Sequence, residues 1–249
     1  MTTIEARAKL TLSLRVTGVR DDGFHLIDAE MVELEVADVL QVTEPADGGD
    51  GGLVVDGPFA EGIGDGPDNL VRRALMLAGR RADVRLTKRI PHGGGLGGGS
   101  ADAAAVLRWA GFADLAAAAR IGADVPFCMV GGRARVRGIG EFVEPLPFVP
   151  RDVTLVVPPF GASTPAVYRA WDALVADGRR PSGTNELEEA AIVVEPRLAD
   201  WRARIESACG ARPVLAGSGS TWWLDGHHPV LSAALSDATV VATRTVDRR

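Results

Sequence analysis

The chain has 249 residues, of which 46% are hydrophobic and 24% are charged, and its formal net charge is −6 at pH 7. This composition supplies a hydrophobic core for one large domain or two small ones. The negative charge argues against nucleic acid or an anionic membrane as the partner, because both select basic surfaces. No apolar run is long enough to span a bilayer, and Cys128 and Cys209 lack metal-ligand spacing, so we expect a cytoplasmic protein with free thiols.

The first predicted element is a strand over residues 8–16, where apolar and polar residues alternate strictly. Such alternation is typical of a half-buried strand. Lys9 and Thr11 then share the face opposite Leu10 and Leu12. That face is expected to be solvated unless a pocket lies over it.

The next elements include both strands and helices. Asp21-Asp22-Gly23 predicts a turn, and a second alternating run surrounds residues 32–36. Residues 45–66 are rich in Gly, Asp and Pro and predict a flexible connection with one short strand at 53–55. The pattern then predicts a helix over 69–80, a strand over 84–90, helices to about residue 121, and strands at 133–137 and 153–157.

The sequence pattern changes near a group of prolines, at positions 147, 150, 158 and 159. Helical spacing over 166–177 and 186–208 is followed by strand patterns near 213–216, 221–224 and 239–246. We therefore expect two domains, 1–150 and 151–249. Alternating strands indicate sheets with one solvated face, which favours an α+β fold over a doubly wound parallel sheet.

The most informative stretch is Pro91-His92-Gly93-Gly94-Gly95-Leu96-Gly97-Gly98-Gly99-Ser100-Ala101-Asp102, with an alanine-rich helical pattern directly after it. Glycine is favoured where the backbone adopts positive φ or approaches a ligand closely. A helix N-terminus offers unpaired N–H groups and a positive dipole end. The stretch therefore predicts a phosphate-binding loop.

Two other phosphate loops compete with this interpretation. A P-loop requires a lysine after its glycines, and the chain has no lysine beyond Lys88. A dinucleotide-binding fingerprint, G-x-G-x-x-G, does match Gly93, Gly95 and Gly98. However, the preceding strand is strongly charged, and Asp114 matches the required acid only approximately.

The whole run, with a strand before it and a helix after it, resembles the phosphate loop of the galactokinase, homoserine, mevalonate and phosphomevalonate (GHMP) kinase superfamily. The resemblance continues in collinear order through most of the chain. Its segments are Ala8-Lys9-Leu10-Thr11-Leu12, Gly18 to His25, Asp68-Asn69-Leu70-Val71, Gly122-Ala123-Asp124-Val125-Pro126-Phe127 and Gly217-Ser218-Gly219-Ser220-Thr221. Within the superfamily, they are most similar to the branch whose substrate is 4-diphosphocytidyl-2-C-methyl-D-erythritol.

The resemblance implies a two-domain α+β fold with the active site in the cleft between the domains. The N-terminal domain would be like domain 2 of ribosomal protein S5, and the C-terminal domain would be a ferredoxin-like α/β sandwich. The implied activity is phosphorylation of the 2-hydroxyl of the cytidyl alcohol, in isoprenoid precursor synthesis, with ATP and Mg²⁺. The partners would be these small molecules alone, with no nucleic acid and no membrane, and the chain would be a monomer or a weak homodimer.

Each candidate site residue has a role under this resemblance. Asp124 and Lys9 would be catalytic, since phosphoryl transfer needs a group that orients the hydroxyl and cations that hold charge on the oxygens. Phe24 would stack on the cytosine, His25 would bond its edge, and Thr11 would contact the substrate. ATP would be bound by Asn69, Pro91, Gly93, Gly94, Gly95, Leu96, Gly97, Gly98, Gly99, Ser100 and Ala101. The sequence identifies no metal ligands.

Some positions depart from the family pattern. Phe24 stands where Tyr is usual, Thr11 where Asn is usual, and Ala101 where a second Ser is common, and the segment 103–121 is short. Two alternative functions stay open: a kinase of the same superfamily with another alcohol, such as homoserine or mevalonate, and a nucleotide-binding sensor without activity.

Overall fold

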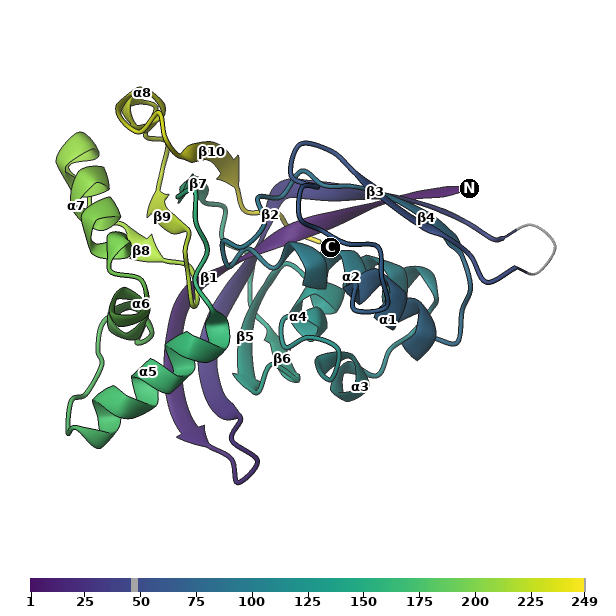
Figure 1. The fold of residues 1–249 in the computed structure, drawn as a ribbon, viewed down its shortest axis with the longest axis horizontal. Coiled ribbons are helices and arrows are strands. Elements are labelled where there is room, and N and C mark those ends of the chain that lie inside the picture. Colours follow the sequence, from purple (N-terminus) through teal and green to yellow (C-terminus); the bar gives the residue numbers. More distant parts are fainter. Residues whose placement is uncertain (46–48, 249) are drawn as a thin grey trace.

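The computed structural model describes residues 1–45 and 49–248. A six-stranded sheet is organised around the long hairpin of β1 (Thr2–Val19) and β2 (His25–Thr43). Its other strands are β3 (Leu53–Asp56), β4 (Asp83–Thr87), β5 (Arg133–Gly138) and β6 (Phe142–Pro145). One edge of β2 pairs with β1, and its other edge pairs with β4 near one end and with β5 near the other. The hairpin therefore extends through the whole N-terminal part (Figure 1).

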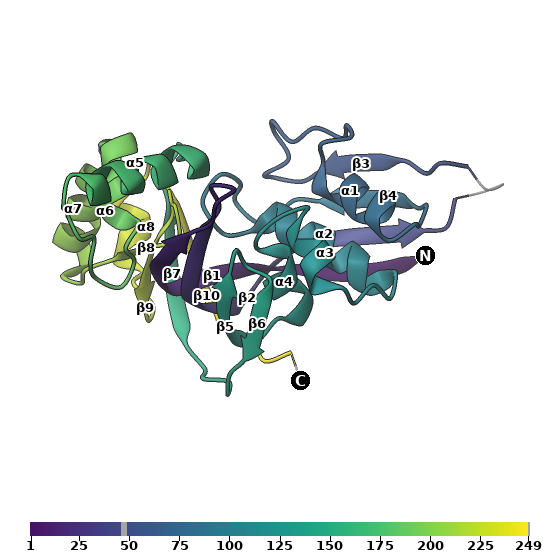
Figure 2. The same cartoon turned by 90° about the horizontal axis from the view of Figure 1, so that it is seen from below.

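Four helices lie beside this sheet, namely α1 (Leu70–Leu77), α2 (Gly98–Trp109), α3 (Leu115–Ala119) and α4 (Val125–Val130) (Figure 2). Helix α2 is central and packs on β1, α1 and α4. Every residue from Ala101 to Leu107 is buried. Because alanine has a small side chain, the neighbouring elements can approach α2 from all sides, which explains why this helix is apolar around most of its circumference.

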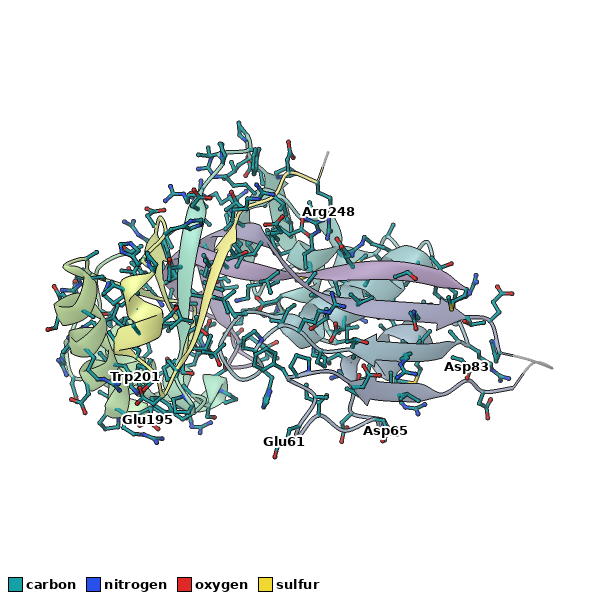
Figure 3. All side chains as sticks on the ribbon, turned by 90° about the horizontal axis from the view of Figure 1, so that it is seen from above. Glu61, Asp65, Asp83, Glu195, Trp201 and Arg248 are labelled. Atoms are coloured by element: carbon teal, nitrogen blue, oxygen red, sulfur yellow. The ribbon has the colours of Figure 1, made fainter. Side chains whose placement is uncertain are left out.

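The second sheet has the strand order β10-β7-β9-β8 and is antiparallel throughout. Its strands are β7 (Asp152–Val157), β8 (Val214–Leu215), β9 (Trp222–Asp225) and β10 (Thr239–Arg244). The accompanying helices are α5 (Thr164–Ala176), α6 (Glu188–Val194), α7 (Arg197–Cys209) and α8 (Val230–Ala234). Figure 3 shows Trp201 of α7 at this end of the molecule and Asp83 of β4 at the opposite end. The molecule is thus elongated, with one sheet toward each end.

The chain returns to the first sheet after β10. Thr245 forms a bridge with Leu34, and the N–H of Val246 donates to the carbonyl of Glu33. Arg248 pairs with the Glu33 carboxylate and also donates to the Cys128 carbonyl, at 2.8 Å (Figure 3). These contacts attach the last residues of the second part to the core of the first. The division into domains 1–150 and 151–249 remains a prediction.

The expected α+β class with two sheets is confirmed, and most predicted elements lie within a few residues of the observed ones. The single helix predicted over 186–208 is wrong, because it divides into α6 and α7 at Pro196, which lacks an N–H and restricts the residue before it. The strand predicted to residue 90 ends at Thr87. Beyond it, the N–H groups of Arg89 and Ile90 donate to the Asp38 carboxylate instead of to a neighbouring strand.

The sequence patterns missed the short elements β6, α4 and α8, which have four to six residues each. Of the connection predicted over 45–66, the strand at 53–55 is confirmed as β3, and residues 46–48 lie outside the described part. In the residues that the structure describes, no helix combines the length and the apolar character needed to cross a membrane.

Candidate active site

The glycine-rich run forms a loop that leads directly into α2. Gly97 is the N-cap residue, and no side chain caps the helix. The first helical backbone bond runs from the N–H of Ala101 to the carbonyl of Gly97, at 2.8 Å. The preceding N–H groups, of Gly98, Gly99 and Ser100, therefore have no partner within the helix. A cavity of about 530 Å³ lies over the loop, so these donors and the helix dipole can act on an anion.

Two glycines of the loop are required by close packing as well as by backbone conformation. Gly97 has φ 68°, and a Cβ atom there would lie 2.7 Å from Cγ of Lys9. Gly95 has φ 78°, and a Cβ atom would lie 2.5 Å from the Ala216 carbonyl oxygen. The loop is therefore wedged between β1 and the segment before β9. We expected glycine for approach to a ligand, and approach to protein is a second reason.

Lys9 is buried beneath this loop. It lies on β1 between two irregularities of the strand register, and its N–H donates to the Leu96 carbonyl at 3.0 Å. Its side chain is 6% exposed, and Nζ lies 3.2 Å from Asp124 Oδ2 and 3.2 Å from Thr11 Oγ1. The prediction of a half-buried strand is thus wrong for residues 8–12, where both faces are covered. The glycine loop covers the strand at Lys9.

Asp124 occupies the N-cap position of α4, yet its side chain makes no capping bond. The carboxylate is directed to Lys9 instead and is 29% exposed. Gly140 packs against the residue before Asp124. A Cβ atom at Gly140 would lie 2.1 Å from the Ala123 carbonyl oxygen. An ammonium and a carboxylate are therefore held together at a partly open position.

A second cavity, of about 510 Å³, opens at this pair. Its lining includes Lys9, Thr11, Phe24, His25 and Asp124, the residues singled out in the sequence as catalytic or substrate-binding candidates. Its other walls come from α5 and from the segment 217–218 of the C-terminal part. Gly95 lines both cavities, so the glycine loop lies at their junction.

The far end of the second cavity is aromatic. Phe24, in the turn between β1 and β2, is 57% exposed. The ring of His25 lies 4.6 Å from that of Tyr168 between centroids. The tip of the β1–β2 hairpin lies beside α5 in both views (Figures 1 and 2), which explains how residues 143 positions apart meet. Burial, together with the charge of Asp124, raises the pKa of Tyr168 to about 12, so this phenol stays neutral.

Sequence reasoning missed the residues that α5 contributes, Tyr168, Arg169 and Asp172. All three line the second cavity, and Asp172 Oδ1 lies 2.7 Å from His25 Nε2. The helical spacing of 166–177 predicted only a packed helix. One signal was available, because Tyr168 is the single tyrosine of the chain.

Three of the predicted ATP residues need separate mention. Asn69 lines the first cavity and caps α1, accepting from the N–H of Val71 at 2.9 Å and donating to the Gly64 carbonyl at 2.7 Å. Ser100 and Ala101 lie just beyond the loop residues that line this cavity. Ala101 is buried, and Ser100 is directed toward Gly122, where a Cβ atom would lie 3.4 Å from its Oγ. Their contact with the nucleotide remains a prediction.

A buried charge cluster of Lys88, Asp38 and Asp102 underlies the loop. Lys88 Nζ lies 2.6 Å from Asp102 Oδ2 and also contacts Asp38. Burial raises the pKa of Asp102 to about 8, although the Lys88 charge acts in the opposite direction. Burial alone would lower the pKa of Lys88, but the charges of Asp102 and Asp38 raise it overall. Lys88 therefore stays an ammonium, held against the start of α2.

Residues 69–132, which span α1 to α4, match the family profile of the GHMP kinases N terminal domain. A crystal structure of 4-(cytidine 5'-diphospho)-2C-methyl-D-erythritol kinase superimposes with a TM-score of 0.76 at 32% identity, over 99% of this chain and 100% of that one. The mevalonate kinase of L. major shares the fold, with a TM-score of 0.65 at 14% identity over 100% and 97% of the two chains. Fold and glycine loop thus define a GHMP kinase.

Two relatives identify the family within the GHMP kinases. The 4-diphosphocytidyl-2-C-methyl-D-erythritol kinase of Paracoccus denitrificans is 42% identical over 87% of this chain and 84% of its own length. That of Pelotomaculum thermopropionicum is 37% identical over 96% and 92% of the two chains. The chain belongs to the 4-diphosphocytidyl-2-C-methyl-D-erythritol kinase family.

Proposed function

We propose that this kinase transfers the γ-phosphoryl group of ATP to the 2-hydroxyl of 4-diphosphocytidyl-2-C-methyl-D-erythritol, a step in isoprenoid precursor synthesis. The observation that carries the proposal is the Lys9–Asp124 pair, 3.2 Å apart, which lines the second cavity, whereas Gly95 of the loop lines both cavities. One cavity has the backbone donors for a triphosphate, and the other has the aromatic walls for a nucleobase. The pair lies where the two substrates would react.

In this proposal, ATP occupies the first cavity. Its phosphates accept hydrogen bonds from the uncapped N–H groups at the start of α2, where the helix dipole also favours negative charge. Asn69 and the segment 62–66, which line the same cavity, would surround the adenosine. Residues 91–99 include one histidine and no Lys, Arg, Asp or Glu, so phosphate binding depends mainly on backbone donors.

The reaction follows from the pair's geometry. The substrate hydroxyl donates to Asp124, and its oxygen attacks the γ-phosphorus as the bond to the bridging oxygen of ADP breaks. Because Lys9 lies beside Asp124, the carboxylate orients the hydroxyl and takes its proton late rather than before attack. The Lys9 ammonium also offsets charge on the phosphoryl oxygens in the loose transition state.

Magnesium is expected to arrive with the nucleotide. Among the described residues, no group of three or more His, Cys, Asp or Glu side chains is arranged to hold a metal ion. This suits Mg²⁺, which commonly keeps several waters and binds through phosphates and one or two carboxylates. Asp124 is the carboxylate on the reacting side that would be available to it. When bound, the ion would neutralise charge on the triphosphate.

The cytidyl group of the acceptor would occupy the aromatic end of the second cavity. Phe24 and Tyr168 offer faces for stacking, and His25 offers an edge for hydrogen bonding. Arg169, exposed on the same wall, could pair with the diphosphate. We further propose that the two domains, 1–150 and 151–249, close on the substrates. We also propose that the enzyme acts in the cytoplasm as a monomer or weak homodimer.

A side-by-side turnover assay tests the function. Purified enzyme, ATP and Mg²⁺ are combined with the cytidyl alcohol, with homoserine or with mevalonate, and ADP release is measured. We expect release with the cytidyl alcohol alone. Turnover of homoserine or mevalonate without turnover of the cytidyl alcohol would establish another kinase of the superfamily. ATP binding without turnover of any alcohol would favour a sensor.

A further inference from the structure

The contact between His25 and Asp172 joins the two halves of the second cavity. His25 begins β2, whereas Asp172 lies on α5, and His25 Nε2 is 2.7 Å from Asp172 Oδ1. The His25 side chain is 11% exposed and that of Asp172 is 45% exposed. Both residues line the cavity that we assign to the cytidyl group, so this inference rests on the proposed function.

One face of α5 fixes the imidazole ring. Tyr168 lies 4.6 Å from His25 between ring centroids, with the planes tilted by 32°. Trp171 meets the ring edge-on, at 5.8 Å and 89°. Tyr168, Trp171 and Asp172 are spaced i, i+3 and i+4, so they share a side of the helix. The two aromatic rings hold the plane of the imidazole, and the carboxylate selects which nitrogen faces α5.

The Asp172 carboxylate also determines which ring nitrogen of His25 carries the proton. An ionised carboxylate can only accept a hydrogen bond, so Nε2 must carry the proton in this contact. In a neutral imidazole, Nδ1 is then an acceptor. Because Nε2 is engaged by Asp172, Nδ1 is the ring nitrogen left for a ligand in the cavity.

Cytosine and uracil differ at the group that such an acceptor would meet. Cytosine carries a 4-amino group, which donates, whereas uracil carries a 4-oxo group, which accepts. An acceptor at Nδ1 would accept a hydrogen bond from the cytosine 4-amino group, whereas it would face a lone pair of the uracil 4-oxo group. A site built to bond a polar group discriminates strongly against an analogue that leaves the bond unmade.

We propose that Asp172 is a positioning residue that fixes the tautomer of His25, and that this contact makes the enzyme select cytidyl over uridyl substrates. Asp172 does not touch the base in this arrangement. It acts through His25, in the way that a carboxylate behind a histidine sets the free nitrogen in other sites.

The test compares kcat/KM for the cytidyl alcohol and for its uridyl analogue. We expect the unsubstituted enzyme to prefer the cytidyl compound by about 100-fold, the factor that one unpaired polar group allows. In Asp172→Asn, the neutral amide no longer forces the proton onto Nε2, and its N–H group can donate to that nitrogen. The preference is therefore expected to fall by about ten-fold or more. The change should lie in KM for the alcohol, not in kcat or KM for ATP.

The matched control is Asp177→Asn, at the C-cap of the same helix and outside the cavity lining. It should retain the full preference, and circular dichroism should show both variants folded. Nitrogen-15 spectra supply a second readout: the His25 signals should indicate protonation at Nε2 in the unsubstituted enzyme and at Nδ1 in Asp172→Asn.

The outcomes separate the inference from the proposed function. If the unsubstituted enzyme does not phosphorylate the cytidyl alcohol, the proposed function fails. If it does, but Asp172→Asn keeps the same preference for cytidine over uridine, the function stands and the role of Asp172 is overturned. An unsubstituted enzyme that uses both compounds equally would also overturn that role.

Discussion

The two cavities on either side of Gly95 are lined by different parts of the chain. The phosphate side is mainly backbone, with the loop residues 91–99 contiguous in sequence and fixed by close packing. The nucleoside side is made of large side chains from the β1–β2 turn and from α5, far apart in sequence. Backbone donors recognise any phosphate, whereas side chains can distinguish one base from another. In the function that we propose, the rigid loop therefore binds phosphate, and the wall assembled from both halves selects the substrate.

The Lys9–Asp124 pair lines the second cavity, and Lys9 contacts the glycine loop through the Leu96 carbonyl. Substituting this pair should give the largest effect. Asp124→Asn removes the group that receives the hydroxyl proton, so kcat should fall by about 10²–10⁴-fold, with KM for ATP little changed. Steady-state kinetics with both substrates measures this. Asp200→Asn, on α7, is the control and should keep full turnover. A kcat within a factor of three for Asp124→Asn would contradict the assignment.

The next largest effect should come from the packing of the phosphate side. Gly97→Ala places a methyl group 2.7 Å from Cγ of Lys9 in a residue with φ 68°. The strain should cost about 1–2 kcal/mol of stability, and displacement of Lys9 should lower kcat/KM by about 100-fold. Thermal unfolding measures the loss of stability and turnover measures the loss of kcat/KM, so measuring both on the same sample separates the two effects.

Gly111→Ala provides a matched control for this change. Gly111 has φ 71°, but a Cβ atom there would have no neighbour within 4 Å. It should lose a similar amount of stability while retaining turnover. If Gly97→Ala and Gly111→Ala behave alike in turnover, the loop does not position Lys9 as we describe.

Smaller effects are expected on the nucleoside side. Removing one aromatic face by Phe24→Ala or Tyr168→Ala should cost about 1–3 kcal/mol, or roughly five-fold to 100-fold in KM for the cytidyl alcohol. KM for ATP should not change, because neither ring lines the first cavity. Phe142→Ala, which removes an exposed ring on β6, serves as the control. Equal increases in both KM values would show that the two sides are not separable.

The last prediction concerns Asp102, and its expected effect is on the pH dependence of unfolding. The folded chain keeps the Asp102 proton up to a pKa of about 8, whereas an unfolded aspartate releases it near 3.8. The fold therefore loses stability as pH rises between these values, because the folded chain there keeps a proton that the unfolded chain has released. Asp102→Asn should flatten that slope in denaturant titrations at several pH values. A slope unchanged by the substitution would mean that Asp102 is ionised in the folded chain.

The sequence singled out more of the residues that line the first cavity than of those that line the second, and the reason is structural. The glycine loop, Lys9 and Asp124 belong to short motifs whose residues keep their roles once the strand and helix around them form. Tyr168 and Asp172 become site residues only because α5 packs beside the hairpin tip, and no local pattern encodes that contact.

The burial of Lys9 illustrates the same limit within the fold. Alternation along β1 predicted a solvated face, but the glycine loop covers Lys9 through the carbonyl of Leu96, 87 residues later, and through Gly97. Likewise, Asp38 lies on β2, Lys88 directly after β4 and Asp102 on α2, and only their packing reveals a charge cluster. Element types could be predicted from periodicity, whereas these long-range contacts could not.

The most direct test of the account is to follow the phosphoryl group itself by phosphorus-31 NMR. With ATP, Mg²⁺ and the cytidyl alcohol, the γ-phosphate signal should disappear as ADP and one phosphomonoester form, with the phosphate on the 2-hydroxyl and the cytidine diphosphate linkage intact. Release of inorganic phosphate alone, or a phosphate on the ribose, would contradict the placement of the acceptor hydroxyl at Asp124.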